Sequence, residues 1–331
     1  MGKHFLQQLS LLTQKLPNIS LVLITRSNKS LSASAQTPID LGKWEKDLDA
    51  SASPALSTQD VINFLAKIQG KCIVVDNTSS QAVANAYPDF LEYGFSIVTP
   101  NKKAFSSTLD LWRAIHTESY RSYAPYLERG LVYHESSVGA GLPIISTLKD
   151  LINTGDEVQR IEGVFSGTMS SLFNSFAPVE GNGGKWSQEV KKAKEAGFTE
   201  PDPRDDLNGV DVARKLVILA RLVGLEIEST DSFPVQSLIP KELESVESGD
   251  VFLERLGEFD GRMEEVRDEA VKEGKVVRFV GSVDVGKKVV KVGLEKFDRS
   301  HPIAGLKGSD NIVSFYTKRY GSNPLVVQGA G

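Results

Sequence analysis

Short apolar segments that alternate with helical ones constrain the fold of the first half of this chain more than any other feature. The apolar runs SLVLIT, CIVVDN, FSIVTP and LVYHES stand at residues 20–25, 72–77, 95–100 and 131–136. Apolar residues recur at helical spacing over residues 5–16, 61–69, 82–94, where Pro88 interrupts the pattern, and 105–116. This alternation is typical of a parallel sheet covered by helices on both faces. It predicts an α/β, Rossmann-like, doubly wound nucleotide-binding domain over residues 1–134.

The second half of the chain has a different pattern. A strand is expected at residues 158–166, a strong helix at 209–224 and a charged helix at 264–275. Two valine-rich strands follow over residues 276–297, with a turn at Gly286, and then the strands VSFYTKR and PLVVQG. Strands that follow helices in this way favour an α+β domain with a mixed or antiparallel sheet over residues 135–331. The stretch PVEGNGGK, at 178–185, is expected to be a surface loop.

Length and composition limit the class of protein. A chain of 331 residues suggests two domains, and its net charge of -5 gives no overall attraction to nucleic acid or anionic membranes. The single cysteine, Cys72, allows no disulfide within the chain and is expected to be a buried core thiol. The four histidines lack metal-ligand spacing, and neither a membrane span nor a secretory signal is found. A cytoplasmic protein is therefore expected.

The segment GFTEPDPRDDLNGVDVARK, at residues 197–215, concentrates charge. Such runs are usually solvated surface, but Pro201 and Pro203 stiffen this one. Asp211 and Lys215 are also four residues apart on a helix that is otherwise apolar, so they share one face. A lysine beside carboxylates can donate a proton to a developing alkoxide, and the carboxylates can bind a substrate ammonium group. Both interpretations stand at this point.

Three further segments carry groups suited to ligands. TPNKKAFSS (99–107) and DNTSS (76–80) follow expected strands, at the edge where doubly wound sheets bind ligands, and the first contains Lys102. Lys102 is equally consistent with a structural role. In HESSVGAGLPII (134–145), backbone carbonyls and Glu135 suit a hard cation, although a plain strand-to-helix turn with Pro143 in its first turn explains the same residues.

The residues after the expected strand SLVLIT predict cofactor preference. NAD-selective domains have an acidic residue at the end of this strand, for the ribose hydroxyls. Here SLVLIT is followed by Arg26 and Lys29, which suit a 2′-phosphate. We therefore expect Arg26, Ser27 and Lys29 to bind the cofactor and NADP to be preferred, with NAD possible.

The motifs together resemble one family. VDNTSS, TPNKKAFSS, VYHESSVGAGLPIIS, IEGVFSGTMS, EPDPRDDLNGVDVARK, FPVQSLIP and SHPIAGLKGSDN occur in this order in a chain similar to fungal homoserine dehydrogenases. The resemblance runs from Gly2 to Gly331. It implies an NAD(P)-dependent oxidoreductase that interconverts L-aspartate 4-semialdehyde and L-homoserine, in threonine, methionine and isoleucine biosynthesis.

The resemblance also implies roles for particular residues. Lys215 corresponds to the proposed general acid of the family, and Lys102 to a lysine between cofactor and substrate that assists proton movement. Asp211 takes part in catalysis and substrate binding. The other implied substrate-binding residues are Glu200, Gly197, Asp206 and Thr168.

Cofactor, cation and partner follow from the same resemblance. Thr78 and Gly2 are expected to bind the cofactor. Glu135, Val138, Ala140 and Leu142 resemble a monovalent cation site, with sodium as the usual ion and backbone carbonyls as most of the ligands. A homodimer paired through strands of the second half is implied.

Two departures from the family raise an alternative. The first strand and two glycines of the G-x-G-x-x-G fingerprint are missing before Gly2, and a C-terminal helix that caps the cofactor is missing after Gly331. The alternative is therefore an inactive or weakly active truncated fragment that acts only as a dimerising chain. The first domain is expected to be damaged in that case. A different Rossmann reductase, of the aspartate-semialdehyde dehydrogenase type, is disfavoured because Cys72 shows no sign of activation.

Overall fold

The computed structural model describes residues 2–34, 36–118 and 130–330, and the chain divides into two compact units. The first unit comprises residues 1–104 and 113–133, and the second comprises residues 105–112 and 134–331. The chain therefore crosses between the units before and after a short segment at 105–112, as well as at residue 134.

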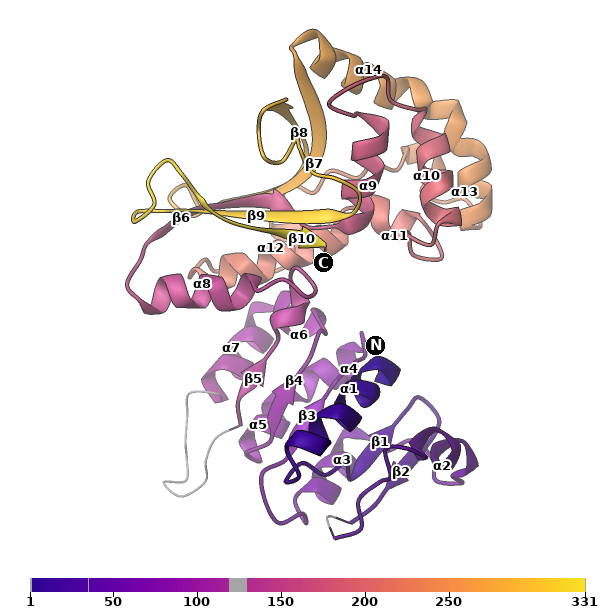
Figure 1. Ribbon diagram of the computed structural model, residues 1–331, viewed down its shortest axis with the longest axis vertical. Coiled ribbons are helices and arrows are strands. Elements are labelled where there is room, and N and C mark those ends of the chain that lie inside the picture. Colours follow the sequence, from indigo (N-terminus) through magenta and orange to yellow (C-terminus); the bar gives the residue numbers. More distant parts are fainter. Residues whose placement is uncertain (1, 35, 119–129, 331) are drawn as a thin grey trace. The chain divides into compact units, whose positions relative to one another are not determined.

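The first unit contains a three-stranded parallel sheet of order β3-β4-β5 (Figure 1). Its strands are β3 (Ile73–Val75), β4 (Ser96–Val98) and β5 (Val132–Tyr133). The helices of this half of the chain are α1 (Gly2–Lys15), α2 (Trp44–Ala50), α3 (Thr58–Leu65), α4 (Gln81–Asn85), α5 (Tyr87–Glu92), α6 (Lys103–Ser106) and α7 (Leu109–Glu118). Strands alternate with helices, which confirms the predicted α/β class.

One expected strand pairs differently. Of residues 20–25, only Leu23–Thr25 (β1) is extended, and it pairs antiparallel with β2 (Ser30–Ser32) in a separate two-stranded sheet. The expectation that this segment extends the parallel sheet is therefore wrong for the described residues. The cause is local: the chain reverses at once after β1, and Arg26 N donates to Lys29 O at 2.8 Å.

Two expected helices are each divided in two. Residues 82–94 form α4 and α5, and Pro88 lies in the first turn of α5, where its missing N–H breaks no helical hydrogen bond. Residues 105–116 fall in α6 and α7, with the division at Ser107 and Thr108. The apolar spacing continued across both divisions, so it could not show them.

The second unit is built on a five-stranded antiparallel sheet of order β10-β9-β6-β7-β8. The strands are β6 (Val158–Val164), β7 (Lys275–Asp284), β8 (Val289–Asp298), β9 (Asp310–Thr317) and β10 (Leu325–Ala330). Ile161 of β6 pairs with Val283 and Phe315, and all three side chains are fully buried. The antiparallel arrangement confirms the sequence expectation of an α+β second domain.

Helices cover one face of this sheet and one end of it (Figure 1). They are α8 (Ile144–Asn153), α9 (Gly167–Phe176), α10 (Trp186–Glu195), α11 (Arg204–Leu207), α12 (Val210–Leu222), α13 (Gly249–Leu256) and α14 (Asp260–Lys272). Short 3-10 turns are η1 (Glu135–Ser137), η2 (Thr230–Ser232), η3 (Lys241–Leu243) and η4 (Gly257–Phe259). Helix α12 packs against α8, β7 and β8, and its residues from Leu216 to Ala220 are fully buried.

None of the helices in the described part of the chain is both long and apolar enough to cross a membrane.

Candidate functional site

The start of α12 brings a cation and a carboxylate together. Lys215 Nζ lies 2.7 Å from Asp211 Oδ2, one helical turn earlier, and only 14% of the Lys215 side chain is exposed. The expectation that these residues share one helix face is therefore confirmed. Gly209 precedes the helix with φ of +74°, and a Cβ there would lie 3.1 Å from the side chains of Phe279 and Val235. Both conditions favour glycine, which fixes where the helix begins.

Lys215 has a second acceptor. Its Nζ donates to the carbonyl oxygen of Phe165 at 2.7 Å, and Phe165 directly follows β6. An ammonium group has three N–H donors, and these two acceptors account for two of them among the described residues. The group is therefore fixed between a helix and a strand end, and one donor remains for a ligand.

Asp206 is the half-buried carboxylate beside this pair. It lies on α11, accepts a 2.8 Å hydrogen bond from Glu200 N, and lies within hydrogen-bonding reach of the Thr168 hydroxyl. Burial raises the pKa of Asp206 above its ordinary value, and the charges of Glu200 and Asp211 raise it further. The two hydrogen bonds oppose that rise. A carboxylate in this position gains from a bound cation, because a positive charge offsets both effects.

Thr168 and Gly197 border the same cluster. Thr168 is near the start of α9, and its hydroxyl donates to Phe198 O at 2.7 Å. Gly197 follows α10 with φ of +74°, so it turns the chain from that helix into Phe198. The structure thus brings together Thr168, Asp206, Asp211 and Lys215, with Glu200 joined through its backbone.

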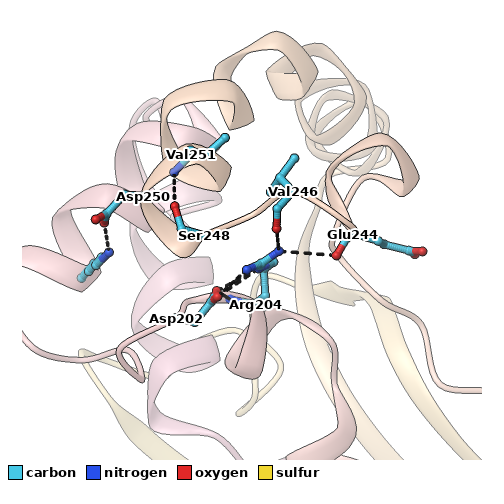
Figure 2. Close-up of polar contacts among 8 residues, drawn as sticks. Asp202, Arg204, Glu244, Val246, Ser248, Asp250 and Val251 are labelled. Carbon is cyan, nitrogen blue, oxygen red and sulfur yellow. Dashed lines mark hydrogen bonds and ion pairs between the residues drawn. The ribbon is translucent and has the colours of Figure 1, made fainter.

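Arg204 and Asp202 hold the segment before α11 in place (Figure 2). Arg204 Nη2 lies 2.6 Å from Asp202 Oδ2, and Arg204 Nη1 donates to Val246 O at 2.8 Å. This ion pair lowers the pKa of the Asp202 carboxyl. From the sequence, these two charges were expected only as part of the charge-rich segment at residues 197–215. The structure gives them a positioning role, which the spacing of two residues alone could not reveal.

A buried network organises the ends of β3 and β4 in the first unit. Asp76 Oδ2 accepts from Tyr87 Oη at 2.6 Å and from Asn101 Nδ2 at 3.0 Å, while Thr99 Oγ1 donates to Asp76 O at 2.9 Å. All four residues are buried. Asp76 Oδ1 also accepts from Thr78 N at 2.7 Å, which orients the loop that carries Thr78. Asp76 and Asn101 lie in the two segments that were expected to carry ligand-binding groups, but their contact with each other and with Tyr87 was not expected.

Lys102 lies between this network and α6. It follows the buried Asn101, whose Oδ1 accepts from Lys103 N at 3.1 Å. Its backbone is therefore fixed on both sides. Lys102 belongs to the first unit and Lys215 to the second.

Arg26, Ser27 and Lys29 occupy the turn between β1 and β2. Asp49 is an acidic neighbour of this turn that was not expected from the sequence. Arg26 Nη1 lies 3.5 Å from Asp49 Oδ1, and Lys29 donates to the carbonyl oxygen of Asp49, in α2. More than half of the Arg26 and Asp49 side chains is exposed, so this pair contributes little. Gly2 is the first residue of the 14-residue helix α1 and is exposed.

The turn after β5 contains the candidate cation ligands. Glu135 Oε1 accepts from Ile145 N at 2.8 Å, and Oε2 accepts from Ser146 N at 2.9 Å, so this carboxylate caps the start of α8. Val138 is buried, Ala140 has φ of +49°, and Leu142 N donates to Gly139 O at 2.9 Å. The side chains of Val138, Ala140 and Leu142 carry no ligand atoms, so a hard cation at this turn would be held by backbone carbonyl oxygens and the Glu135 carboxylate. Groups of three or more His, Cys, Asp or Glu suited to a metal are not found in the described residues.

Family profiles match nearly all of the sequence. The profile described as homoserine dehydrogenase matches residues 143–331, and the profile of the homoserine dehydrogenase NAD binding domain matches residues 1–127.

Curated fungal proteins extend this similarity across the whole chain. The homoserine dehydrogenase of Emericella nidulans is 56% identical, and that of Saccharomyces cerevisiae is 51% identical. Each match covers 100% of this chain and 90% of the relative. Similarity of this extent does not favour the alternative of a chain that serves only to dimerise.

Solved structures have the same fold. A Candida auris protein of unknown function is 47% identical, with a TM-score of 0.87 over 94% of this chain and 85% of that one. A hyperthermophilic archaeal homoserine dehydrogenase in complex with NADPH has a TM-score of 0.67 at 19% identity, over 100% of this chain and 88% of that one. At that identity the second likeness concerns the fold alone.

Proposed function

Since the chain belongs to the homoserine dehydrogenase family, we propose that it interconverts L-aspartate 4-semialdehyde and L-homoserine, with Lys215 as the proton donor to the substrate oxygen. The observation that carries this assignment is the position of Lys215 Nζ, 2.7 Å from Asp211 and 2.7 Å from Phe165 O. The chain is an NAD(P)-dependent oxidoreductase, and its reaction belongs to the biosynthesis of threonine, methionine and isoleucine.

Lys215 meets the chemical need of the reaction. Reduction of an aldehyde creates an alkoxide, which requires charge stabilisation and a proton. An ammonium group supplies both, and the reverse direction requires the same nitrogen to accept a proton. Asp211 keeps Nζ in one place, and the Phe165 carbonyl restricts it further. The nearly enclosed position of Lys215 limits competition from water.

The acidic groups around Lys215 select an amino-acid substrate. We assign the substrate ammonium group to Glu200 and Asp211, with Asp206 adding negative charge beside them. Burial, together with the charges of Glu200 and Asp211, raises the pKa of Asp206, and a bound ammonium group would offset both effects. Thr168 and Gly197 complete the pocket wall. A plain aldehyde without an ammonium group gains nothing from these charges.

Lys102 is proposed to assist proton movement in the same reaction. Its support is local: the buried Asn101 on one side and α6 on the other hold its backbone at the end of a parallel strand. Ligands bind at that edge in doubly wound sheets.

NADP is the proposed cofactor, and it supplies the hydride when bound. Arg26, Ser27 and Lys29 would hold its 2′-phosphate, because their turn presents two cations, the exposed Arg26 and the half-buried Lys29. Thr78 would contact the ribose or nicotinamide from the loop that Asp76 orients. Gly2 would face the pyrophosphate from the start of α1, where backbone N–H groups favour anions.

A monovalent cation, with sodium as the first candidate, is proposed for the turn that contains Glu135, Val138, Ala140 and Leu142. The oxygen donors and the left-handed backbone at Ala140 support it. The ion would hold this turn and hence the start of α8. A rise in melting temperature with sodium chloride over choline chloride, at equal ionic strength, would support the site. No difference between the salts would argue against it.

We also propose a homodimer in the cytoplasm, paired through the outer face of the five-stranded sheet. On that face Arg160 stacks on Tyr316, with its guanidinium carbon 4.0 Å from the ring centroid, and lies 3.2 Å from Glu162. These half-buried polar groups suit a partner surface. Light scattering of the purified chain measures its mass in solution. Twice the mass of one chain would support the homodimer, and the mass of a single chain would contradict it.

The activity has a direct assay. The purified chain should reduce NADP in the presence of L-homoserine and should not do so with 4-hydroxybutanoate, which lacks only the amino group. The variant Glu200→Gln should narrow that discrimination, whereas Glu258→Gln, on the exposed surface, should leave it unchanged. Equal rates with both substrates would contradict the assignment of the acidic groups.

A further inference from the structure

A charged cavity lies in the second unit, among residues to which the proposed function assigns no role. It has a volume of about 310 Å³ and lies between the loop after α9, helix α14 and the start of β7. Figure 1 shows these elements side by side at one end of the sheet. Its charged lining residues are Arg267, Asp268, Lys275 and Arg299.

The lining is strongly cationic. Three cations and one carboxylate leave a net formal charge of +2. Asp268 lies 3.1 Å from Arg267 and is 58% exposed, so water screens this pair and it contributes little free energy. Lys275 is 3.5 Å from Glu273, which also binds Lys296 at 2.6 Å. Within the described residues, the cavity thus has more positive charge than its neighbours neutralise.

A buried arginine behind the wall adds to this charge. Arg278 is 2% exposed, and Nη1 donates to the carbonyl oxygens of Ala177 and Val277 at 2.8 Å each. Both of those residues line the cavity. Its Nε has no hydrogen-bond partner in the described part of the chain, and burial lowers its pKa to about 10. No nearby carboxylate is among the causes of that shift.

Specific contacts hold the wall of the cavity in place. Arg267 is fixed by a 3.0 Å hydrogen bond to Gly184 O and lies over the ring of Phe176. Arg299 donates to Val179 O. A Cβ on Gly183 would lie 1.7 Å from Phe176 O, so only glycine allows this loop to approach the end of α9. Arginines fixed by carbonyl groups keep other N–H donors available for a ligand.

From these observations we propose that the cavity binds a small phosphate-bearing anion, such as a phosphate monoester or a diphosphate. The net charge of +2 matches a phosphate dianion, and the guanidinium groups suit its several oxygen acceptors. The cavity adjoins the end of α9, and the same helix begins beside Thr168 of the proposed substrate pocket. The site does not depend on the proposed catalytic roles.

Inorganic pyrophosphate is the probe that tests the proposal. It would be titrated calorimetrically into the full chain at constant ionic strength, with excess NADPH present to occupy a dinucleotide site. Saturable binding is expected. The double variant Lys275→Ala with Arg299→Ala should weaken it about tenfold or more. Lys272→Ala removes a cation from the end of α14 that does not line the cavity, and it should bind like the unmodified chain.

One further variant and one comparison ligand test whether binding depends on the charge of the cavity and on phosphate chemistry. Asn182→Asp adds a carboxylate to an exposed lining position without removing a contact of the core, and it should also weaken binding. Malonate, a dicarboxylate of similar size, should bind more weakly than pyrophosphate. Absence of saturable binding, equal binding by the double variant, or a preference for malonate would each overturn the proposal.

Discussion

Arg221 donates a 2.8 Å hydrogen bond to the carbonyl oxygen of Phe105, which lies 116 residues earlier in the chain. The same guanidinium donates to the carbonyl oxygens of Ser107 at 2.6 Å and of Ile227 and Glu228 at 3.0 Å each. Arg221 is on α12, the helix that carries Lys215, and Phe105 is only three residues after Lys102. One buried cation thus holds the residues downstream of Lys102 to the helix of the proposed proton donor.

The variant Arg221→Met is expected to destabilise the protein. It leaves four carbonyl groups without their donor, and each buried acceptor left unsatisfied costs roughly 1–3 kcal/mol before the site relaxes. We expect a loss of about 3 kcal/mol or more in the free energy of unfolding, measured in urea. Faster hydrogen exchange at residues 105–112 should accompany it. Arg255→Ala, which breaks an exposed ion pair on α13, is the matched control. A loss no larger than that of the control would contradict the anchoring role.

Asp206 gives a prediction with a defined pH dependence. Burial raises its pKa in the folded state, so ionisation costs more there than in the unfolded chain. Its contribution is therefore most favourable below the unfolded pKa and is lost as the pH rises through the raised folded value. Asparagine keeps the acceptor for Glu200 N and does not ionise. The melting temperature of Asp206→Asn, relative to the unmodified chain, should rise between pH 4 and pH 7.

The opposite trend, in which the variant loses relative stability as the pH rises, would mean that ionised Asp206 is stabilised in the folded state. Asp205→Asn is a suitable control, since Asp205 is the exposed neighbour on α11. Substrate affinity should also fall in Asp206→Asn, because the amide cannot offset an ammonium charge.

The spacing of apolar residues was sufficient to predict many of the helices and strands of this fold. Helix α12 was expected within two residues at each end, because its apolar face is long and regular and Gly209 marks its start. The β7 and β8 hairpin was also expected, since valines alternate on both sides of its turn. Helices α9 and α10 were missed. Small and polar residues such as Ser170 and Ser171 in α9 obscure the period that packing around Phe173 and Trp186 supplies.

Some contacts of the candidate site could likewise be expected from the sequence, and others could not. The pairing of Asp211 with Lys215 followed from a separation of four residues, which helix geometry converts into contact. The Asp76 network and the anchor from Arg221 to Phe105 did not follow, because their partners are 11 to 25 and 116 residues apart. Only the folded chain brings such groups together. Asp49 was missed beside Arg26 for the same reason.

That ion pair between Arg26 and Asp49 allows a test of cofactor preference. Arg26→Ala should raise the KM for NADP about tenfold, the equivalent of roughly 1.4 kcal/mol, and leave the KM for NAD nearly unchanged. Asp49→Ala removes the competing carboxylate and should lower the KM for NADP or leave it as it is. Steady-state kinetics with both cofactors provide the comparison. Equal effects of Arg26→Ala on NADP and NAD would show that Arg26 does not recognise the 2′-phosphate.

Turnover of Lys215→Ala in homoserine oxidation is the measurement that bears most directly on the central claim. If Lys215 handles the proton, kcat should fall about a hundred- to ten-thousand-fold, the usual contribution of a general acid or base. Lys215→Arg keeps a positive charge but cannot exchange the proton, so it should lose nearly as much. Circular dichroism should show both variants folded, and Arg255→Ala should retain full activity. A kcat for Lys215→Ala within a few-fold of the unmodified chain would contradict the account.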